Sequence, residues 1–294
     1  MATYSIKDLE SLSGIKAHTI RIWEQRYKLL SPKRTETNIR LYGEHDLKLL
    51  LSISLLYNEG YKISKIAQMS CEEINQEVIN ITDTHYSFDN QIKALTIAMI
   101  EMDEGRFEKI LSTSILQNGF SKTMLEIIYP FLEHIGILWQ IGAINPAQEH
   151  FISNLIRQKI IVAIDGQVSQ LTDKSKKFLL FLPENELHEI GLLFSHFLIK
   201  SQHHKVFYLG ASVPLNDVKE VYDIHRPEYV LSIFTAGTHI DLLKAWIKEL
   251  SDKFPKSKLL IAGPQTANIK AGDVSDNVIL INSFHELNTI ASEA

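Results

Sequence analysis

Cysteine and long apolar runs are almost missing from this sequence of 294 residues. Cys71 is the single cysteine, so an intrachain disulfide and any multi-cysteine zinc or iron–sulfur site are excluded. No apolar run reaches the ~18 residues that span a bilayer. The first twenty residues also lack the basic start and apolar core of a signal peptide. We therefore expect a cytoplasmic protein with no membrane partner.

The composition is that of a globular protein, with 45% hydrophobic and 22% charged residues, which excludes disorder, collagen and fibres. The formal net charge of −5 is unevenly spread. Residues 1–70 hold 11 basic and 7 acidic residues, whereas the rest of the chain holds 19 basic and 28 acidic. A basic head on an acidic body is expected when only the head meets a polyanion such as DNA.

The basic head has the pattern of a winged helix-turn-helix. A capped amphipathic helix ends at Gly14, and a second short helix covers residues 16–27. Pro32 fixes an extended entry, and apolar and polar residues alternate over 39–42, which predicts a two-stranded wing. A leucine-rich helix then begins at Glu44.

Three motifs of the head resemble the MerR family of transcriptional regulators over residues 4–69. They are T-I-R-x-W-E-x-R-Y in the second helix, P-x-R-T-x4-R-x-Y in the wing and GY-x-I-x-x-I after the leucine-rich helix. Asn38 stands where the family usually has Gly, and Asn tolerates the same left-handed backbone. The resemblance implies that residues 1–75 bind double-stranded promoter DNA. It also implies that the start of the second helix enters the major groove, with His18, Thr19 and Arg21. The wing would reach phosphates and the minor groove, with Arg34, Arg40 and Tyr42. The simpler alternative is a small helical domain whose arginines form a solvated face.

Residues 76–172 predict a helical cap. Residues 76–90 are polar and irregular, which suits a linker or short connecting element. Four helical stretches then predict a four-helix bundle: 91–102, 106–116, 121–139 and 146–164. Trp139 is followed ten residues later by Glu149 and His150. From this segment alone, a core tryptophan and a carboxylate favoured by a helix dipole are the simpler interpretation.

Residues 173–294 alternate five apolar strands with helices, which predicts an α/β Rossmann-like (flavodoxin-like) domain. Its parallel sheet is covered on both faces, and ligands are expected at the carboxyl ends of the strands. The whole chain is therefore predicted as multidomain: an all-α winged helix-turn-helix head (1–75), a four-helix bundle cap (76–172) and the α/β domain (173–294).

Three segments at that predicted edge resemble the cobalamin-binding motif D-x-H-x-x-G…S-x-L…G-G. They run from Glu186 to Gly191, from Ser232 to Phe234, and over Ala262 and Gly263. Glu186, Phe234 and Ala262 depart from the motif. A Rossmann-like domain whose histidine merely lies on a loop is the alternative.

The motif implies a role for each residue. His188 would coordinate cobalt as the lower axial ligand, and Glu186 would hydrogen-bond the other ring nitrogen. Gly191 would let the next helix start close to the corrin. A slot for the nucleotide tail would be lined by small residues: Ser232, Ala262 and Gly263.

The order of the three parts resembles the CarH/LitR photoreceptor repressors, and Trp139, Glu149 and His150 match the W-x9-E-H signature of that family. The resemblance implies adenosylcobalamin as cofactor, with Trp139 over the upper corrin face and the other two residues at the adenosyl group. Gln140 stands where light sensors of the family carry a histidine.

We therefore predict a cobalamin-dependent transcriptional regulator and not an enzyme. It would act as a repressor, bind promoter DNA as a homo-oligomer (dimer or tetramer) with cofactor bound, and be released by light or cofactor loss. Two alternatives stay open. One is a corrinoid carrier or cobalamin enzyme. The other is a MerR-type regulator whose sensor binds another ligand or no cobalamin.

Overall fold

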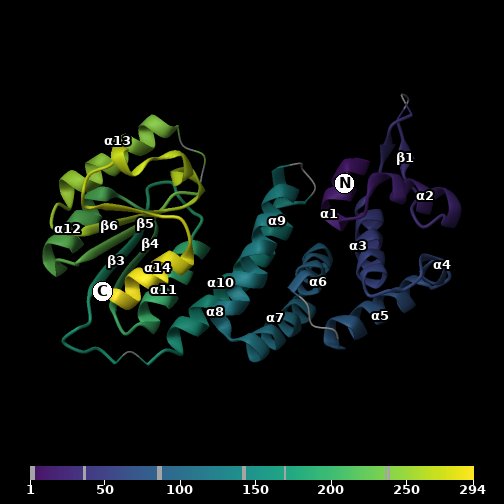
Figure 1. The fold of residues 1–294 in the computed structure, drawn as a ribbon, viewed down its shortest axis with the longest axis horizontal. Coiled ribbons are helices and arrows are strands. Elements are labelled where there is room, and N and C mark those ends of the chain that lie inside the picture. Colours follow the sequence, from purple (N-terminus) through teal and green to yellow (C-terminus); the bar gives the residue numbers. More distant parts are fainter. Residues whose placement is uncertain are drawn as a thin grey trace. The chain divides into compact units, whose positions relative to one another are not determined.

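The computed structural model describes residues 4–35, 38–84, 88–140, 144–168, 170–235, 237 and 239–294. The chain divides into two compact units, residues 1–155 and 156–294 (Figure 1). The predicted boundaries after residues 75 and 172 do not coincide with this division and stay predictions. Among the described residues, no helix combines the length and apolar character needed to cross a bilayer.

The predicted winged helix-turn-helix is present at the start of the first unit. Its elements are α1 (Ile6–Ser13), α2 (Ala17–Tyr27), β1 (Lys33–Arg34), β2 (Arg40–Leu41), α3 (Glu44–Asn58) and α4 (Ile63–Ile66). Ser5 begins α1 with a capping box, and Gly14 ends it in the left-handed conformation. The strands β1 and β2 pair antiparallel. Asn38 has φ 63°, so the wing tip uses the left-handed backbone that the sequence predicted.

The interpretation of residues 76–84 as irregular is wrong, because helix α5 runs over Cys71–Thr84. Ser70 begins this helix, and its backbone N–H donates to the Glu73 carboxylate (2.7 Å). Only Ile74 and Val78 are buried among its described side chains. Two apolar residues on one face are too weak a signal to outweigh the polar residues around them.

The four predicted cap helices are confirmed. They are α6 (Phe88–Glu101), α7 (Glu104–Asn118), the continuous run α8 (Phe120–Thr123), η1 (Met124–Ile128) and α9 (Tyr129–Gln140), and α10 (Pro146–Asp165). The segment η1 is a π-helical turn just before Pro130. Because proline has no N–H to donate, a wider turn lets the helix continue through it.

The second unit contains a five-stranded parallel sheet, as predicted. The strands are β3 (Lys177–Pro183), β4 (Lys205–Val213), β5 (Tyr229–Ile233), β6 (Lys258–Ala262) and β7 (Val278–Ile281). Their spatial order is β4-β3-β5-β6-β7, the 2-1-3-4-5 order of flavodoxin-like folds. The order reverses between β3 and β5, so the crevice for ligands is expected beyond the carboxyl ends of these two strands.

Helices cover both faces of this sheet (Figure 1). Those on one face are α12 (Leu215–His225) and α13 (Ile240–Lys253), and those on the other are α11 (Ile190–Ser201) and α14 (Phe284–Glu293). Successive residues of β5 alternate between the two cores, with Val230 in one and Leu231 in the other. The sequence did not predict α14. Two short 3₁₀ turns, η2 (Pro264–Asn268) and η3 (Ala271–Asp273), follow β6.

Candidate functional site

The loop after β3 presents a histidine held by a buried carboxylate. Glu186 is 5% exposed, and one of its oxygens lies 2.5 Å from Nδ1 of His188 and 3.1 Å from the His188 backbone N–H. The His188 side chain is 63% exposed. Because the carboxylate engages Nδ1, Nε2 is the ring nitrogen that faces away and can bind a metal.

Both neighbouring strands fix this loop. The second oxygen of Glu186 accepts the backbone N–H of Thr235 (2.8 Å), just beyond the end of β5. On the other side, Ser212 near the end of β4 donates its backbone N–H to the Glu186 carbonyl (3.1 Å). Its hydroxyl accepts the backbone N–H of Asn185 (3.1 Å). His188 therefore lies at the carboxyl edge of the sheet, beside the point where the strand order reverses.

Ser232 supplies an independent sign of a missing polar partner. It lies on β5, between Phe181 of β3 and Ile261 of β6, and its 0% exposure makes it fully buried. Its hydroxyl has no hydrogen-bond partner in the described part of the chain. Leaving such a group unsatisfied costs about 1–3 kcal/mol. A polar ligand atom entering between the strands would remove that cost, so the donor set fits cobalamin with a buried tail.

The structure gives a reason for glycine at two positions of the motif that the sequence did not indicate. Gly263 has φ 111°, and a Cβ there would lie 2.2 Å from the carbonyl oxygen of Phe234. The collision is therefore with the chain's own backbone, before any ligand is considered. A Cβ on Gly191 would lie 3.3 Å from Cδ1 of Ile233, so close packing of α11 on β5 favours glycine there. Ala262 is half-buried, and its carbonyl accepts the N–H of Phe234 (2.9 Å).

Glu149 and His150 lie in the first turn of α10, within the first unit. Glu149 accepts the Ser153 hydroxyl (2.5 Å) and pairs with Nδ1 of His150 (2.9 Å), and the His150 side chain is 74% exposed. Trp139 and Gln140 end α9, but their side chains lie outside the described residues. The predicted grouping of Trp139 with Glu149 and His150 therefore stays a prediction.

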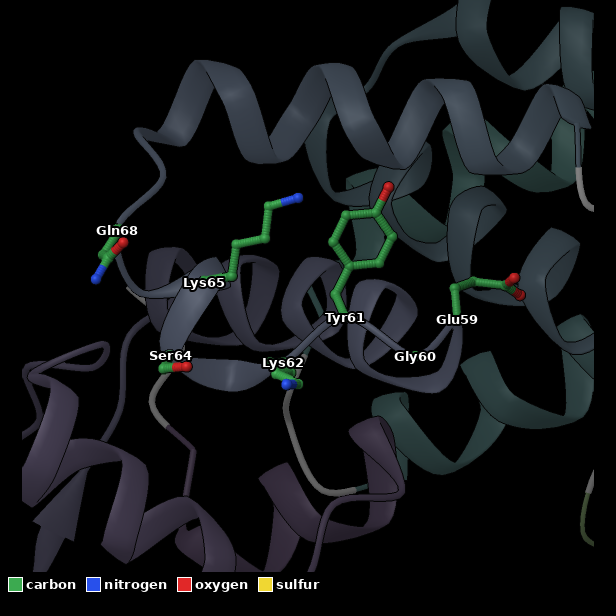
Figure 2. Close-up of a pocket in the computed structure, with 7 residues that line it drawn as sticks. All are labelled: Glu59, Gly60, Tyr61, Lys62, Ser64, Lys65 and Gln68. Atoms are coloured by element: carbon green, nitrogen blue, oxygen red, sulfur yellow. The ribbon is translucent and has the colours of Figure 1, made fainter.

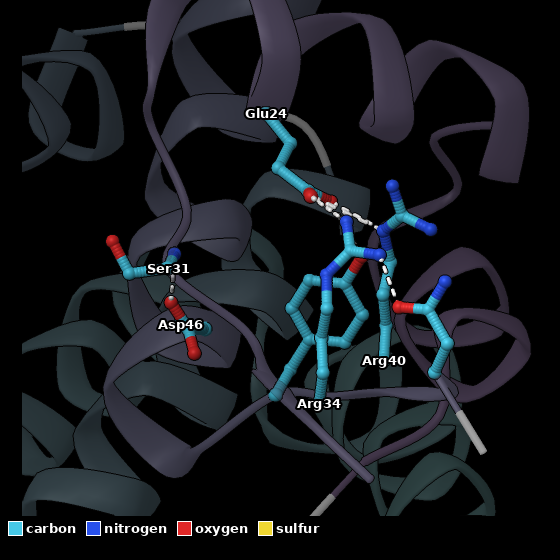
Figure 3. A network of polar contacts seen from close by, with 7 residues as sticks. Glu24, Ser31, Arg34, Arg40 and Asp46 are labelled. Carbon is cyan, nitrogen blue, oxygen red and sulfur yellow. Dashed lines mark hydrogen bonds and ion pairs between the residues drawn. The ribbon is translucent and has the colours of Figure 1, made fainter. Parts of the chain in front are cut away.

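The wing residues that the sequence predicted to contact DNA lie around Glu24 of α2 (Figure 3). Nε of Arg40 lies 2.9 Å from one Glu24 oxygen, and Nη2 of Arg34 lies 3.8 Å from the other. The Tyr42 hydroxyl also donates to Glu24 (3.1 Å). Burial, followed by the Glu24 charge, raises the pKa of Tyr42, so its hydroxyl remains a donor. Glu24 was not singled out in the sequence.

These residues differ in how they face solvent. On α2, His18 and Arg21 are exposed and Thr19 is half-buried. In the wing, the Arg34 side chain is 46% exposed and that of Arg40 20%. Tyr42 is fully buried and forms a bridge with Tyr4. Tyr42 thus has a packing role inside the head. Glu24 holds Arg40 against α2.

A polar hollow of about 440 Å³ lies beside α4 (Figure 2). It is lined by Glu59, Gly60, Tyr61, Lys62, Ser64, Lys65 and Gln68. Nζ of Lys65 lies 5.4 Å from the Tyr61 ring centroid, and Tyr61 donates its hydroxyl to Glu77 (3.1 Å). The two lysines add positive charge to the head at a position that the sequence interpretation did not select.

Comparisons with known proteins agree with this arrangement. Residues 4–72 match the family profile of MerR HTH family regulatory proteins, and residues 91–163 match the B12 binding domain. The HTH-type transcriptional repressor CarH of Myxococcus xanthus is 28% identical over 234 residues, which cover 78% of this chain and 77% of CarH. This chain is a MerR-type transcriptional regulator with a B12-binding domain.

Two further proteins are similar to this regulator. The HTH-type transcriptional repressor CarA of Myxococcus xanthus is 25% identical over 237 residues, which cover 79% of this chain and 76% of CarA. The solved structure of the monomethylamine corrinoid protein of Methanosarcina barkeri covers 74% of this chain and 99% of its own, with a TM-score of 0.54 and 15% identity. That likeness concerns the fold alone.

A contact between the head and the cap was also missed in the sequence. Nε2 of Gln148 donates to Glu44 in the first turn of α3 (3.0 Å) and to the carbonyl of Ile100 at the end of α6 (3.2 Å). Oε1 of Gln148 accepts the backbone N–H of Asn145 (3.0 Å). One amide thus joins α10, α6 and α3 of this regulator, next to Glu149 and His150.

Proposed function

We propose that this regulator binds adenosylcobalamin and represses transcription at promoter DNA while the cofactor is bound. Loss of the cofactor, or illumination, then lowers its affinity for DNA. The observation that carries the proposal is the His188 imidazole, which Glu186 holds at the reversal point of a flavodoxin-like sheet. The similarity to CarH and CarA over more than three quarters of the chain supports the regulatory part.

On the cofactor side, His188 would hold the cobalt, and Ser232 would receive a polar atom of the nucleotide tail between β5 and its neighbours. Ala262 and Gly263 border that slot. Trp139, Glu149 and His150 would hold the upper corrin face and the adenosyl group. Adenosylcobalamin supplies a cobalt–carbon bond that light breaks. Gln140 offers no imidazole on that face, so the light response is less persistent than one locked by a second histidine.

On the DNA side, His18, Thr19 and Arg21 read the major groove from the start of α2. Arg34 and Arg40 contact phosphates from the wing, while Tyr42 supports them from inside. The protein acts in the cytoplasm as a homo-oligomer, a dimer or tetramer, because a two-fold operator requires two heads. No long coiled-coil helix follows the wing in the sequence, so the oligomer forms through the sensor part.

The test uses the full-length chain, incubated with adenosylcobalamin in the dark and passed through gel filtration. We expect the protein peak to carry cobalamin absorbance, and the His188→Ala variant to lose most of it. Electrophoretic mobility shifts with promoter DNA then compare the cofactor-bound dark form, the illuminated form and the cofactor-free form. Protein that emerges colourless, or a His188→Ala variant with wild-type spectrum and affinity, would overturn the cobalamin assignment. In that case a MerR-type sensor for another ligand becomes the better explanation.

A further inference from the structure

The carboxylate directly after His188 is held from two sides. One oxygen of Glu189 accepts the hydroxyl of Tyr208 on β4 (2.7 Å). Nε of Arg157 on α10 donates to the other oxygen (2.8 Å). Glu189 is the N-cap residue of α11, and its side chain is only 18% exposed. The residue that follows the candidate cobalt ligand is thus joined to a strand and to the part of α10 that belongs to the second unit.

The strand β4 is shaped for this contact. Leu180 of β3 pairs with Tyr208, but the next residue pairs with Gly210, so β4 contains a bulge at this point. Bulges bend a strand and redirect its side chains. Gly210 has φ 87°, and a Cβ there would lie 3.4 Å from the Glu189 oxygen that binds Tyr208. The bulge therefore brings Tyr208 to Glu189 and leaves space for the carboxylate.

The Tyr208 ring is itself fixed. His196 of α11 stacks on it, with ring centroids 5.3 Å apart and an interplanar angle of 20°. Burial and the Glu189 hydrogen bond raise the pKa of Tyr208, so its hydroxyl stays a donor. The Arg157 side chain is 49% exposed, and exposed ion pairs contribute little to stability. Tyr208 is thus the stronger of the two anchors.

We propose that Glu189 is a positioning residue: anchored by Tyr208 and Arg157, it fixes the backbone of His188 so that Nε2 is presented to cobalt. Glu186 orients the imidazole ring, while Glu189 fixes the chain that carries it. An exposed imidazole on a loose loop would lose conformational freedom on binding, and a fixed loop has already lost it. This inference rests on the proposed function, because it deepens the role of the same site.

The experiment compares Glu189→Gln and Tyr208→Phe with the wild-type full-length chain. Tyr208→Phe removes only the hydroxyl and keeps the ring that packs on His196. Asp223→Asn is the matched control, since it makes the same carboxylate-to-amide change in the exposed pair with Lys219 on α12. Adenosylcobalamin is titrated in the dark, and the absorbance spectrum reports the fraction of bound cofactor that carries a protein imidazole. Thermal unfolding of the cofactor-free proteins reports the fold.

We expect Glu189→Gln and Tyr208→Phe each to weaken binding, by no more than the roughly 10- to 100-fold that loss of a direct partner of a metal ligand costs, and to lower the imidazole-ligated fraction. Their double variant should be little worse than Glu189→Gln alone, because both act through one contact. Asp223→Asn should behave as wild type. Wild-type affinity and spectrum in Tyr208→Phe would overturn the proposal, as would weaker binding accompanied by an equal loss of fold. A wild-type chain that binds no cobalamin would instead refute the proposed function.

Discussion

Replacement of Glu24 by glutamine tests how the wing arginines are held. In the structure one carboxylate lies beside both Arg40 and Arg34 and accepts the Tyr42 hydroxyl. Glutamine keeps the size and an acceptor oxygen for Tyr42 but removes the charge. One guanidinium charge is then no longer offset by a carboxylate inside the head, and we expect its contact with a phosphate to strengthen.

The magnitude follows from counterion release. Each phosphate contact contributes about 0.9 to the slope of log affinity against log salt. A strengthening equivalent to at most one contact should therefore steepen that slope by up to about 0.9, which is about 3.5-fold in relative affinity between roughly 50 and 200 mM salt. Fluorescence anisotropy of the full-length chain on non-specific duplex DNA measures it, with Asp252→Asn in the exposed pair with Lys248 as control. A slope that is unchanged or shallower in Glu24→Gln, with circular dichroism unaltered, would refute the reasoning.

Four further predictions follow from the other contacts. Substitution of Arg21, exposed on α2, should change the preference among operator sequences by roughly 1–3 kcal/mol at one base pair, and a uniform loss across sequences in competition assays would contradict a base contact. Gln148→Ala removes the amide that joins α10 to Glu44, so it should reduce the ratio of the DNA affinity with cobalamin to that without it. The control Gln76→Ala on α5 should leave this ratio unchanged. An undiminished ratio in Gln148→Ala would argue against coupling through this contact. Burial, and secondarily Lys200, lowers the pKa of His196 from 6.5 to about 4. The free energy of unfolding should therefore have its full value above pH 6.5 and fall as the pH drops toward 4. In urea denaturation, the His196→Gln variant should lose roughly 1–3 kcal/mol less over this pH range, a figure that allows for the partly exposed ring. Illumination should change the absorbance of the cofactor-bound protein and lower its DNA affinity, more persistently in Gln140→His than in wild type, and indifference of both readouts to light would exclude a photosensor.

The fold could be predicted from the sequence wherever local patterns were strong. Five apolar strands separated by amphipathic helices led to the parallel sheet, and the wing was visible as an alternation after Pro32. The helix α5 was missed because its described buried face contains only Ile74 and Val78. The π-helical turn before Pro130 was missed because it accommodates the missing backbone N–H of this one proline. A structural feature that depends on one or two residues cannot be distinguished from chance in the amino-acid sequence.

The site was predictable only as far as its contacts are local. Glu186 and His188 are two residues apart, so the motif could place them together. Gln148 and Glu44 are 104 residues apart. The contact between Glu189 and Tyr208 depends on a β-bulge, which the sequence pattern of β4 does not indicate. The backbone of Phe234, which leaves no room for a side chain at Gly263, is also distant in the sequence, so this second reason for the glycine could not be predicted.

The departure at position 186 shows how a local motif depends on distant geometry. The motif has Asp where this chain has Glu186, and the sequence offers no reason for the longer side chain. In the structure one oxygen of Glu186 contacts Nδ1 of His188, and the other accepts the N–H of Thr235 beyond β5. An aspartate is shorter by one carbon–carbon bond, about 1.5 Å, so it could keep both contacts only if the loop moved toward β5. The extra methylene therefore lets one carboxylate orient the imidazole and fasten the loop to the neighbouring strand, so the substitution keeps His188 in the arrangement that the proposed cobalt coordination requires.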